Sequence, residues 1–209
     1  MTADGSKVFL GGDFLTVNGV PSNWLASTDG TGTLRPITWT NVEGPVFDLS
    51  LSDDETRIAA AQSGAGNQGA VFNPDTGIRL WRQRCDGDGQ AVEIVEGTLF
   101  SGFHEACDGD TTRRLTANNL ATGARQTDFV PTFDRFWGVR SIDGNGTALL
   151  VTGDFTNVSG VAARGFFILP FRYVPPPPVQ LPDNATWKYL VTPSTPAGWN
   201  QPGFDDTAW

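Results

Sequence analysis

The sequence predicts an all-β fold: a partial β-propeller of about four blades, each a four-stranded antiparallel sheet. Three Thr-Gly dipeptides, ending at Gly32, Gly77 and Gly123, are spaced 45 and 46 residues apart. The chain of 209 residues has 25 glycines, 14 prolines and only 18% charged residues, which is typical of many short strands joined by turns. No long stretch shows the periodicity of an amphipathic helix.

One complete unit shows how a blade is expected to form. VFDLSL, residues 46–51, is the first predicted strand, and the DDET turn leads into RIAAAQS. GAVFN follows a glycine-rich loop, and IRLW follows the PDTG turn as the fourth strand. The next unit repeats this order with QAVEIV, TLFSGF, RRLTANN and ARQTDF, and the last contains WGVRSI, ALLVTGDF and RGFFIL. A unit of about 45 residues is the usual length of a four-stranded blade.

A Gly-Asp-Phe turn ends the second strand of both the first and the last unit. It occurs at residues 12–14 and again at residues 153–155. Glycine allows a tight turn or close backbone approach, and we expect the phenylalanine to pack between blades. We expect Asp13 and Asp154 to accept hydrogen bonds within these turns rather than to act as catalytic carboxylates.

The first unit lacks its innermost strand. TADGSK, residues 2–7, has the composition of a turn between two strands, but only the second of them follows. The chain therefore carries slightly less than four blades, whereas closed propellers use about 4 to 8. We expect the parent protein to supply further blades upstream, because an open stack would leave an apolar face and a strand edge in water.

The repeats are predicted to occupy residues 1–173. VPPPPVQLP, residues 174–182, favours an extended polyproline spacer. Residues 183–209 contain three of the seven tryptophans, which suggests the start of a second domain.

Charge and hydropathy exclude two classes of partner. The net charge is −9 and the basic residues form no stripe, which argues against a nucleic-acid partner. No apolar run reaches the ~18 residues of a membrane span, so we expect none.

The two cysteines, Cys85 and Cys107, lie 22 positions apart in loop-like sequence. An oxidised pair would fit an exported protein, and two buried thiols are the alternative. A Zn²⁺ site with His104, the single histidine, would require both cysteines to stay reduced.

Acidic residues gather around the cysteines in RQRCDGDGQ and GFHEACDGD. Carboxylates in flexible turns are suitable ligands for Ca²⁺, but Asp-Gly pairs are also ordinary turn residues and the twelve-residue calcium loop is absent. We expect no obligatory cofactor, with calcium as the candidate ion. The candidate ligands are Asp86, Asp88, Asp108 and Asp110.

No catalytic residue can be identified from the sequence. No nucleophile elbow is present, and the only imidazole is that of His104. Paired carboxylates among Asp13, Asp154, Glu105 and Asp108 are a possible hydrolytic set, and solvated or turn-capping acids are the simpler interpretation.

A binding surface is the favoured hypothesis. Trp39 and Trp81 follow Thr-Gly turns, and we expect them to pack between blades. Trp137 lies beside Arg135 at the start of a blade and is placed to be exposed, where it can stack on a sugar or an aromatic side chain. The candidate binding residues are Trp137, Arg135, His104 and Glu105.

VFLGGDFLTVNGV, FNPDTG and LLVTGDFTNVSGVAARGFFIL resemble the delta-sixty repeats of exported bacterial β-propeller proteins. ATWKYL and GWNQPGFDDTAW are similar to the opening of galactose-binding-like β-sandwich modules. The second unit departs from the pattern, with AAAQSGAGN in place of the Gly-Asp-Phe turn.

The resemblance implies a secreted or cell-surface, multidomain parent in which the repeats form a non-catalytic scaffold. Such a scaffold presents loops to a glycan or protein partner. The alternative is a hydrolase with an acidic, metal-dependent site around His104. In the scaffold hypothesis, further domains of the same parent protein carry any catalytic activity.

Overall fold

The structure is a computed structural model that describes residues 1–170. These residues belong to one compact unit, Met1–Phe171. The predicted linker (174–182) and the predicted start of a β-sandwich (183–209) lie outside the described residues and stay predictions, as does the domain boundary at residue 173.

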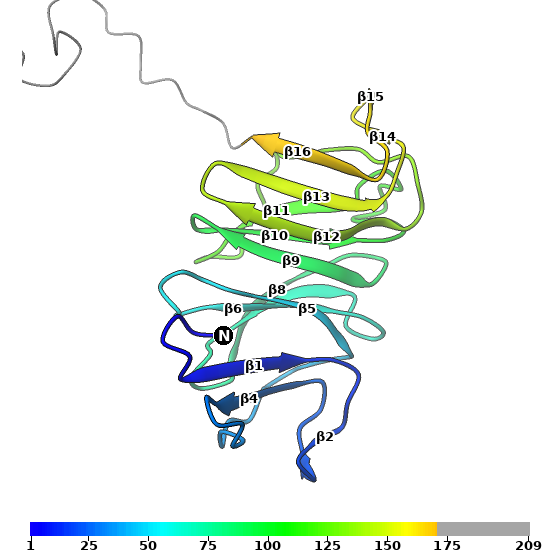
Figure 1. The fold of residues 1–209 in the computed structure, drawn as a ribbon. Helices are drawn as coiled ribbons and strands as arrows, with labels where there is room; N and C mark the ends of the chain where they lie inside the picture. Colours follow the sequence, from blue (N-terminus) through cyan, green and yellow to red (C-terminus); the bar gives the residue numbers. More distant parts are fainter. Residues whose placement is uncertain (171–209) are drawn as a thin grey trace, which may run out of the picture. The chain divides into compact units, whose positions relative to one another are not determined.

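The described residues form strands and turns and no helix, so the prediction of an all-β fold is confirmed (Figure 1). The strands are β1 (Lys7–Gly11), β2 (Thr16–Val17), β3 (Val20–Pro21), β4 (Leu25–Asp29), β5 (Val46–Leu51), β6 (Ile58–Gln62), β7 (Gln68–Phe72), β8 (Arg79–Arg84), β9 (Gly89–Val95), β10 (Thr98–Phe103), β11 (Leu115–Asn119), β12 (Gly138–Asn145), β13 (Ala148–Asp154), β14 (Asn157–Val158), β15 (Val161–Ala162) and β16 (Phe166–Pro170).

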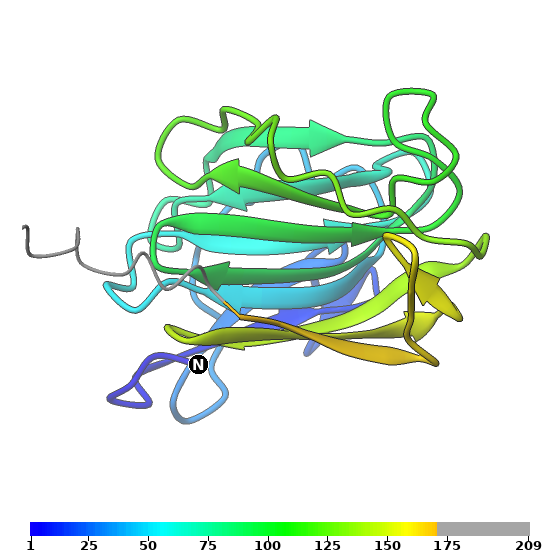
Figure 2. The same cartoon turned by 90° about the horizontal axis from the view of Figure 1, so that it is seen from above.

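Four antiparallel sheets follow one another along the chain. The first contains β1 and β4, the second β5 to β8, the third β9 to β11, and the fourth β12, β13 and β16. Two small hairpins, β2–β3 and β14–β15, are inserted in the first and fourth sheets (Figures 1 and 2). Strands β5, β9 and β12, which open their sheets, contact one another in series.

Among the described residues, only the second sheet has the four strands of a complete predicted unit. In the first and third sheets the fourth strand is reduced to single bridges, Thr28 with Leu34 and Asn118 with Arg125. Pro36 stands two residues after Leu34 and cannot donate the hydrogen bond that would extend this strand. In the third sheet the chain turns after the bridge, because the N–H of Phe129 donates to the oxygen of Gln126 (3.3 Å). The predicted regular four-stranded blade is therefore present once.

The Thr-Gly period reflects a repeated turn. The Asn73 side chain accepts hydrogen bonds from the N–H groups of Asp75 and Thr76, and Gly77 has a φ of 72°. Asn119 does the same for Ala121 and Thr122 before Gly123, whose φ is 75°. Asp29 accepts from Thr31 and Thr33 around Gly32, at a φ of 89°. An Asn or Asp acceptor followed by a glycine with positive φ explains the spacing.

The Gly-Asp-Phe turns are also equivalent, but the aspartates play no part in them. The N–H of Gly12 donates to the oxygen of Trp24 (3.1 Å), and the N–H of Gly153 donates to the oxygen of Gly165 (3.0 Å). No described residue donates a hydrogen bond to the side chain of Asp13 or Asp154, so the prediction that they accept turn hydrogen bonds is wrong. In the fourth sheet the carboxylate that accepts hydrogen bonds beside this turn is that of Asp134, which accepts the N–H groups of Thr156 and Asn157.

Apolar side chains fill the space between neighbouring sheets. Alternation along β6 sends Ala60 toward the first sheet, where it packs with Leu25 and Phe72, and sends Ala59 and Ala61 toward the third. The third and fourth sheets enclose the largest cluster, which includes Phe155 and Leu115. Trp39 packs against the cluster that contains Ala60, and Trp81 packs against the cluster that contains Ala59 and Ala61, as predicted.

Candidate functional site

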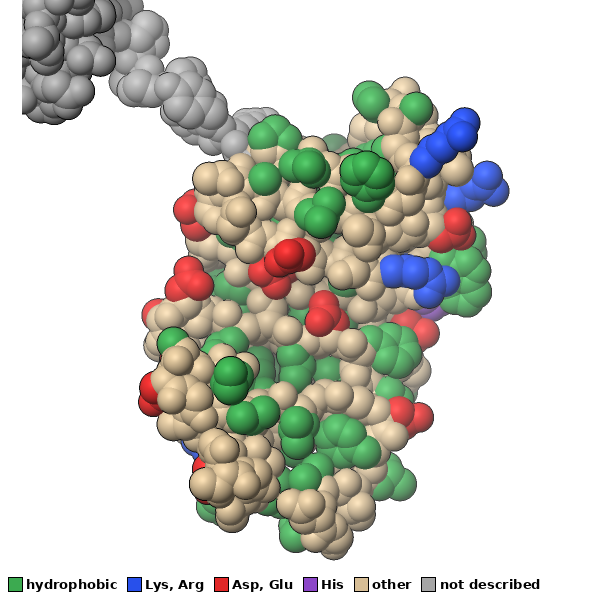
Figure 3. Space-filling view, viewed as in Figure 1, with side chains coloured by type: hydrophobic (Ala, Val, Ile, Leu, Met, Phe, Trp, Pro, Cys, Tyr) green, Lys and Arg blue, Asp and Glu red, His purple; other side chains and the backbone are tan. Residues whose placement is uncertain are grey.

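Three aromatic rings meet where the loop after β10 reaches the start of β12. The ring centroids of Phe136 and Trp137 are 5.2 Å apart, and each lies 5.3 Å from the imidazole of His104. Phe136 is 50% exposed and Trp137 46% exposed, whereas the His104 side chain is only 13% exposed. Figure 3 shows hydrophobic side chains, basic side chains and the histidine gathered at this edge of the molecule. We call Phe136, Trp137 and His104 the aromatic cluster.

Arg114 holds the backbone of the aromatic cluster in place. Its Nε donates to the carbonyl oxygens of Arg135 (3.3 Å) and Phe136 (3.2 Å). The N–H of Glu105 donates to the oxygen of Phe136 as well (2.9 Å). Gly138, the first residue of β12, has a φ of 52° and leaves room for Arg114, whose Cδ lies 2.6 Å from where a Cβ would stand. The backbone that carries the two exposed rings is therefore held by Arg114 and by the start of β12.

His104 pairs with a carboxylate. Its Nε2 lies 3.3 Å from Oδ2 of Asp88, and the other oxygen of Asp88 accepts the N–H of Gly64 at 2.8 Å. Gly87 approaches the histidine so closely that an added Cβ would lie 2.8 Å from Nδ1. Nδ1 is buried and has no hydrogen-bond partner among the described residues.

Arginines flank the exposed rings. The guanidinium carbon of Arg140 lies 5.2 Å from the centroid of the Trp137 ring, and Arg140 and Arg135 are exposed. A cation over an exposed ring is held by only about 0.5–1 kcal/mol, so a ligand can displace it. The arrangement therefore offers exposed apolar ring surface with hydrogen-bond donors beside it.

The disulfide prediction is confirmed. Cys85 follows β8 and is bonded to Cys107, with the two Cα atoms 4.4 Å apart. Both cysteines form a small buried cluster with Phe103. The bridge therefore ties the loop that carries His104 and Glu105 to the end of the second sheet.

The four aspartates predicted as calcium ligands are each engaged by protein donors. Asp86 accepts the N–H of Gly109, and Asp88 pairs with His104. Asp108 lies against two arginines, and Asp110 accepts the N–H and hydroxyl of Thr112. Within residues 1–170, no three acidic, cysteine or histidine side chains are placed to share an ion. Calcium binding stays a prediction.

The structure brings together some predicted site residues and separates others. His104, Trp137, Arg135 and the backbone of Glu105 meet in one place. Sequence reasoning missed Arg140, and it assigned Asp88 to calcium rather than to His104. The signal for Arg140 was its position three residues after Trp137, within the predicted strand WGVRSI.

A second group of carboxylates lies on the strands that open the sheets, and no motif in the sequence predicts it. Asp48 on β5 accepts the N–H of Val92 on β9 (3.1 Å), and Ser50 accepts the N–H of Ile94 (2.9 Å). Burial, with smaller contributions from Asp143 and Asp48, raises the pKa of Glu93 to about 7. Burial also raises the pKa of Asp48.

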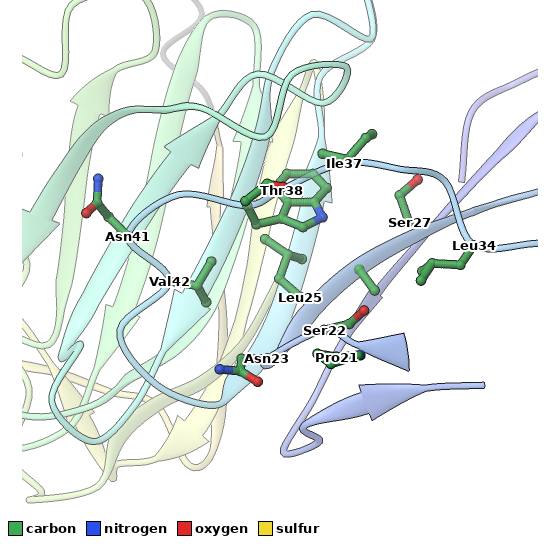
Figure 4. A pocket seen from close by; sticks show the side chains of 12 residues that line it. Pro21, Ser22, Asn23, Leu25, Ser27, Leu34, Ile37, Thr38, Asn41 and Val42 are labelled. Atoms are coloured by element: carbon green, nitrogen blue, oxygen red, sulfur yellow. The ribbon is translucent and has the colours of Figure 1, made fainter. Parts of the chain in front are cut away.

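A separate pocket of about 280 Å³ lies beside the first sheet (Figure 4). Its lining includes Leu25, Ile37 and Val42 together with the Trp39 ring. It contains none of the predicted site residues, and Trp39 is already packed edge-on against Phe9 and Phe72.

Comparisons with known proteins show similarity of fold alone. No protein-family model and no curated protein matches the sequence. Among solved structures, the chain is similar to hydrazine synthase of Kuenenia stuttgartiensis, with a TM-score of 0.57 and 12% identity over 81% of this chain and 44% of that chain. This chain thus spans less than half of the protein it matches.

Two computationally designed proteins, Ika4 and Ika8, match with TM-scores of 0.46 and 0.49 and identities of 9% and 11%. The matches cover 63% and 67% of this chain and 78% and 42% of theirs, and the scores are too low to support a conclusion. Within residues 1–170, no helix has the length and apolar character needed to cross a membrane.

Proposed function

We propose that the four sheets are successive blades of a β-propeller in a larger exported bacterial surface protein of the delta-sixty type. Three features support this proposal: the antiparallel up-and-down order within each sheet, the apolar clusters between neighbouring sheets, and the repeated Thr-Gly turn. The disulfide is compatible with an exported protein.

We propose further that the protein is a non-catalytic binding module and that its aromatic cluster binds a glycan. The observation that carries this proposal is the pair of half-exposed rings, Phe136 and Trp137, on a backbone that Arg114 holds through the carbonyl oxygen of Phe136. Aromatic rings stack on the apolar faces of sugar rings, and polar groups at the rim then fix orientation. Arg135, Arg140 and the His104–Asp88 pair are the polar groups at this rim.

The test is binding of the full 209-residue chain to soluble polysaccharides and immobilised glycans, measured by calorimetry and on arrays. Trp137→Ala removes the larger ring and is expected to weaken binding at least about tenfold, since the loss of an exposed stacking contact costs on the order of 1.4 kcal/mol or more. Phe166→Ala is the matched control, because Phe166 is an exposed aromatic residue on β16. Equal affinity of wild type and Trp137→Ala would refute the glycan site, and capture of a protein partner instead would assign the surface to that partner.

A hydrolase is the second candidate, and the His104–Asp88 pair is the observation that favours it. Among the described residues, however, no hydroxyl or thiol forms a hydrogen bond with His104. The discriminating experiment is a broad hydrolase screen with and without Ca²⁺, on the wild type and on the variants His104→Ala and Asp108→Ala. Turnover that both substitutions abolish would establish the hydrolase and displace the binding module.

A further inference from the structure

Three arginines have guanidinium groups that the rest of the described chain does not engage. Arg135, Arg140 and Arg164 are exposed. Within residues 1–170, none of the three forms an ion pair with a carboxylate or donates a hydrogen bond from its side chain. The guanidinium carbon of Arg140 lies over the Trp137 ring, 5.2 Å from the ring centroid. We call Arg135, Arg140 and Arg164 the free arginines.

The other basic side chains in this part of the chain are bound by protein acceptors. Asp75, Glu43 and Asp108 each hold two or more of them in ion pairs. Arg57 donates to oxygen atoms of its neighbour in the sequence, and Arg114 donates to the carbonyl oxygens behind the aromatic cluster. The side chains held by carboxylates are Lys7, Arg35, Arg79, Arg82, Arg84, Arg113 and Arg125.

The free arginines gather at one end of the fourth sheet, beside the aromatic cluster. Arg135 lies just before β12, and Arg140 lies within its first half. Arg164 precedes Gly165, whose carbonyl oxygen accepts the N–H of Gly153 (3.0 Å) near the end of β13. The end of β13 pairs with the start of β12, so all three arginines belong to the same end of this sheet. Figure 3 shows basic side chains at this edge, next to the histidine and to hydrophobic side chains.

Carboxylates lie on the same loops, but they do not pair with the free arginines. Asp88 pairs with His104, and Asp134 accepts hydrogen bonds at the turn after β13. Glu105 and Asp154 are exposed, and neither forms an ion pair with a free arginine. The whole chain has a net charge of −9, so unpaired cations are unusual in it. Their donors are available to a ligand.

The chemistry of the free arginines complements that of the Trp137 ring. A guanidinium group presents a planar fork of donors that matches the oxygens of a carboxylate or a sulfate. A sugar ring that stacks on Trp137 has to displace Arg140 from the ring, because the guanidinium lies over it. A negatively charged group on that sugar gives the displaced guanidinium a new partner, whereas a neutral sugar leaves it without one.

We propose that the glycan bound at the aromatic cluster is anionic. A carboxylate or sulfate group of the sugar binds Arg140 and Arg135, while the sugar ring stacks on Trp137. Arg164 offers a further cation at the same end of the sheet for the next charged residue of the glycan. This inference rests on the proposed glycan-binding function and adds the class of glycan to it.

The test measures binding of the full 209-residue chain to polygalacturonate and to its fully methyl-esterified form by calorimetry. The two polymers have the same backbone and differ in the charge on each sugar. We expect the charged polymer to bind about tenfold or more tightly than the neutral one, because a charge-assisted hydrogen bond is roughly twice as strong as a neutral one. Dextran sulfate and dextran form a second pair, which distinguishes sulfate from carboxylate as the bound group.

Substitutions of the arginines test the residues themselves. Arg140→Gln and Arg135→Gln should each weaken binding of the charged polymer about fivefold or more and change binding of the neutral polymer less than about twofold. Arg57→Gln is the matched control, because it removes the same charge from the turn between β5 and β6, which has no part in the aromatic cluster. Both affinities of this variant should stay within about twofold of the wild type.

Equal affinity for the charged and neutral polymers of both pairs would overturn the anionic specificity. An equal loss with Arg140→Gln and with Arg57→Gln would also overturn it, because net charge alone would then explain the binding. Trp137→Ala separates these results from the glycan site. Binding that Trp137→Ala weakens without any preference for charge would retain the glycan site and refute its anionic specificity. If Trp137→Ala weakens no binding to any of the four polymers, both proposals fail.

Discussion

Gly87 has no room for a side chain, although its backbone needs no unusual torsion angle. We expect Gly87→Ala to push His104 away from Asp88, because the added methyl group would meet the imidazole and the backbone carbonyl of His104. Overpacking of this kind costs about 1–3 kcal/mol of folding free energy. The measurement is the NMR signals of the His104 ring together with the free energy of unfolding.

Gly109→Ala is the control for this substitution. A Cβ at Gly109 meets nothing within 4 Å, and its φ of 72° makes the cost one of backbone strain alone. The His104 signals should stay unchanged in this variant. A similar shift of these signals in both variants would show that Gly87 has no special part in placing the ring.

A second prediction at the residue scale concerns Glu93. Burial raises its pKa from 4.5 to about 7, so the folded state holds a proton that the unfolded state releases. Between these values the folded state binds more protons, and stability therefore falls as pH rises from about 4.5 to about 7. Glu93→Gln should remove this loss of stability. The difference between the unfolding midpoints of the variant and of the wild type should therefore increase, in favour of the variant, from pH 4 to pH 8.

The control for Glu93 is Glu96→Gln, at an exposed position just after the same strand. Its midpoint should follow the wild type across the whole range. Should Glu93→Gln and Glu96→Gln give the same difference at pH 4 and pH 8, the buried carboxyl would not be the cause.

At the scale of elements, the disulfide fixes the loop that carries His104. The bridge closes a loop with a sequence separation of 22, which should contribute about 3 kcal/mol by restricting the unfolded chain. We expect the double variant Cys85→Ala, Cys107→Ala to lose stability of this size in chemical denaturation, and reduction of the wild type to match it. An unchanged denaturation midpoint in the double variant would contradict this, and reduction of the double variant serves as the control.

Local turn chemistry explains which elements the sequence could predict. Each Thr-Gly turn depends on an Asn or Asp acceptor and a glycine with positive φ within five consecutive residues. The regular spacing of these turns can therefore be recognised from the sequence alone. The predicted fourth strand ARQTDF is reduced to a single bridge, because the chain turns at Gln126–Phe129 instead of continuing beside β11, and strand pairing of this kind is not encoded in a local pattern. The same limit applies to the aromatic cluster: His104 follows β10 and Trp137 precedes β12, which belong to different sheets, and no local pattern joins them.

At the scale of the whole molecule, the sheets contact their neighbours in series, and each apolar cluster lies between two of them. Stability should then be a sum of sheet terms and nearest-neighbour terms. A substitution that weakens the interface between the third and fourth sheets should therefore destabilise the fourth sheet, at the end of the series, more than the others.

Phe155 tests this arrangement, because it is 2% exposed and packs edge-on against Phe133 and Phe167 at 5.4 and 5.6 Å. Phe155→Ala should cost about 3–5 kcal/mol. The loss should appear in hydrogen exchange as faster exchange of β12, β13 and β16, with β5 to β8 still protected. Phe166→Ala, at a position 61% exposed, should change the free energy of unfolding by no more than about 0.5 kcal/mol. Uniform loss of protection across all four sheets would show instead that they unfold as one cooperative unit, since serial coupling predicts that the second sheet keeps its own two interfaces.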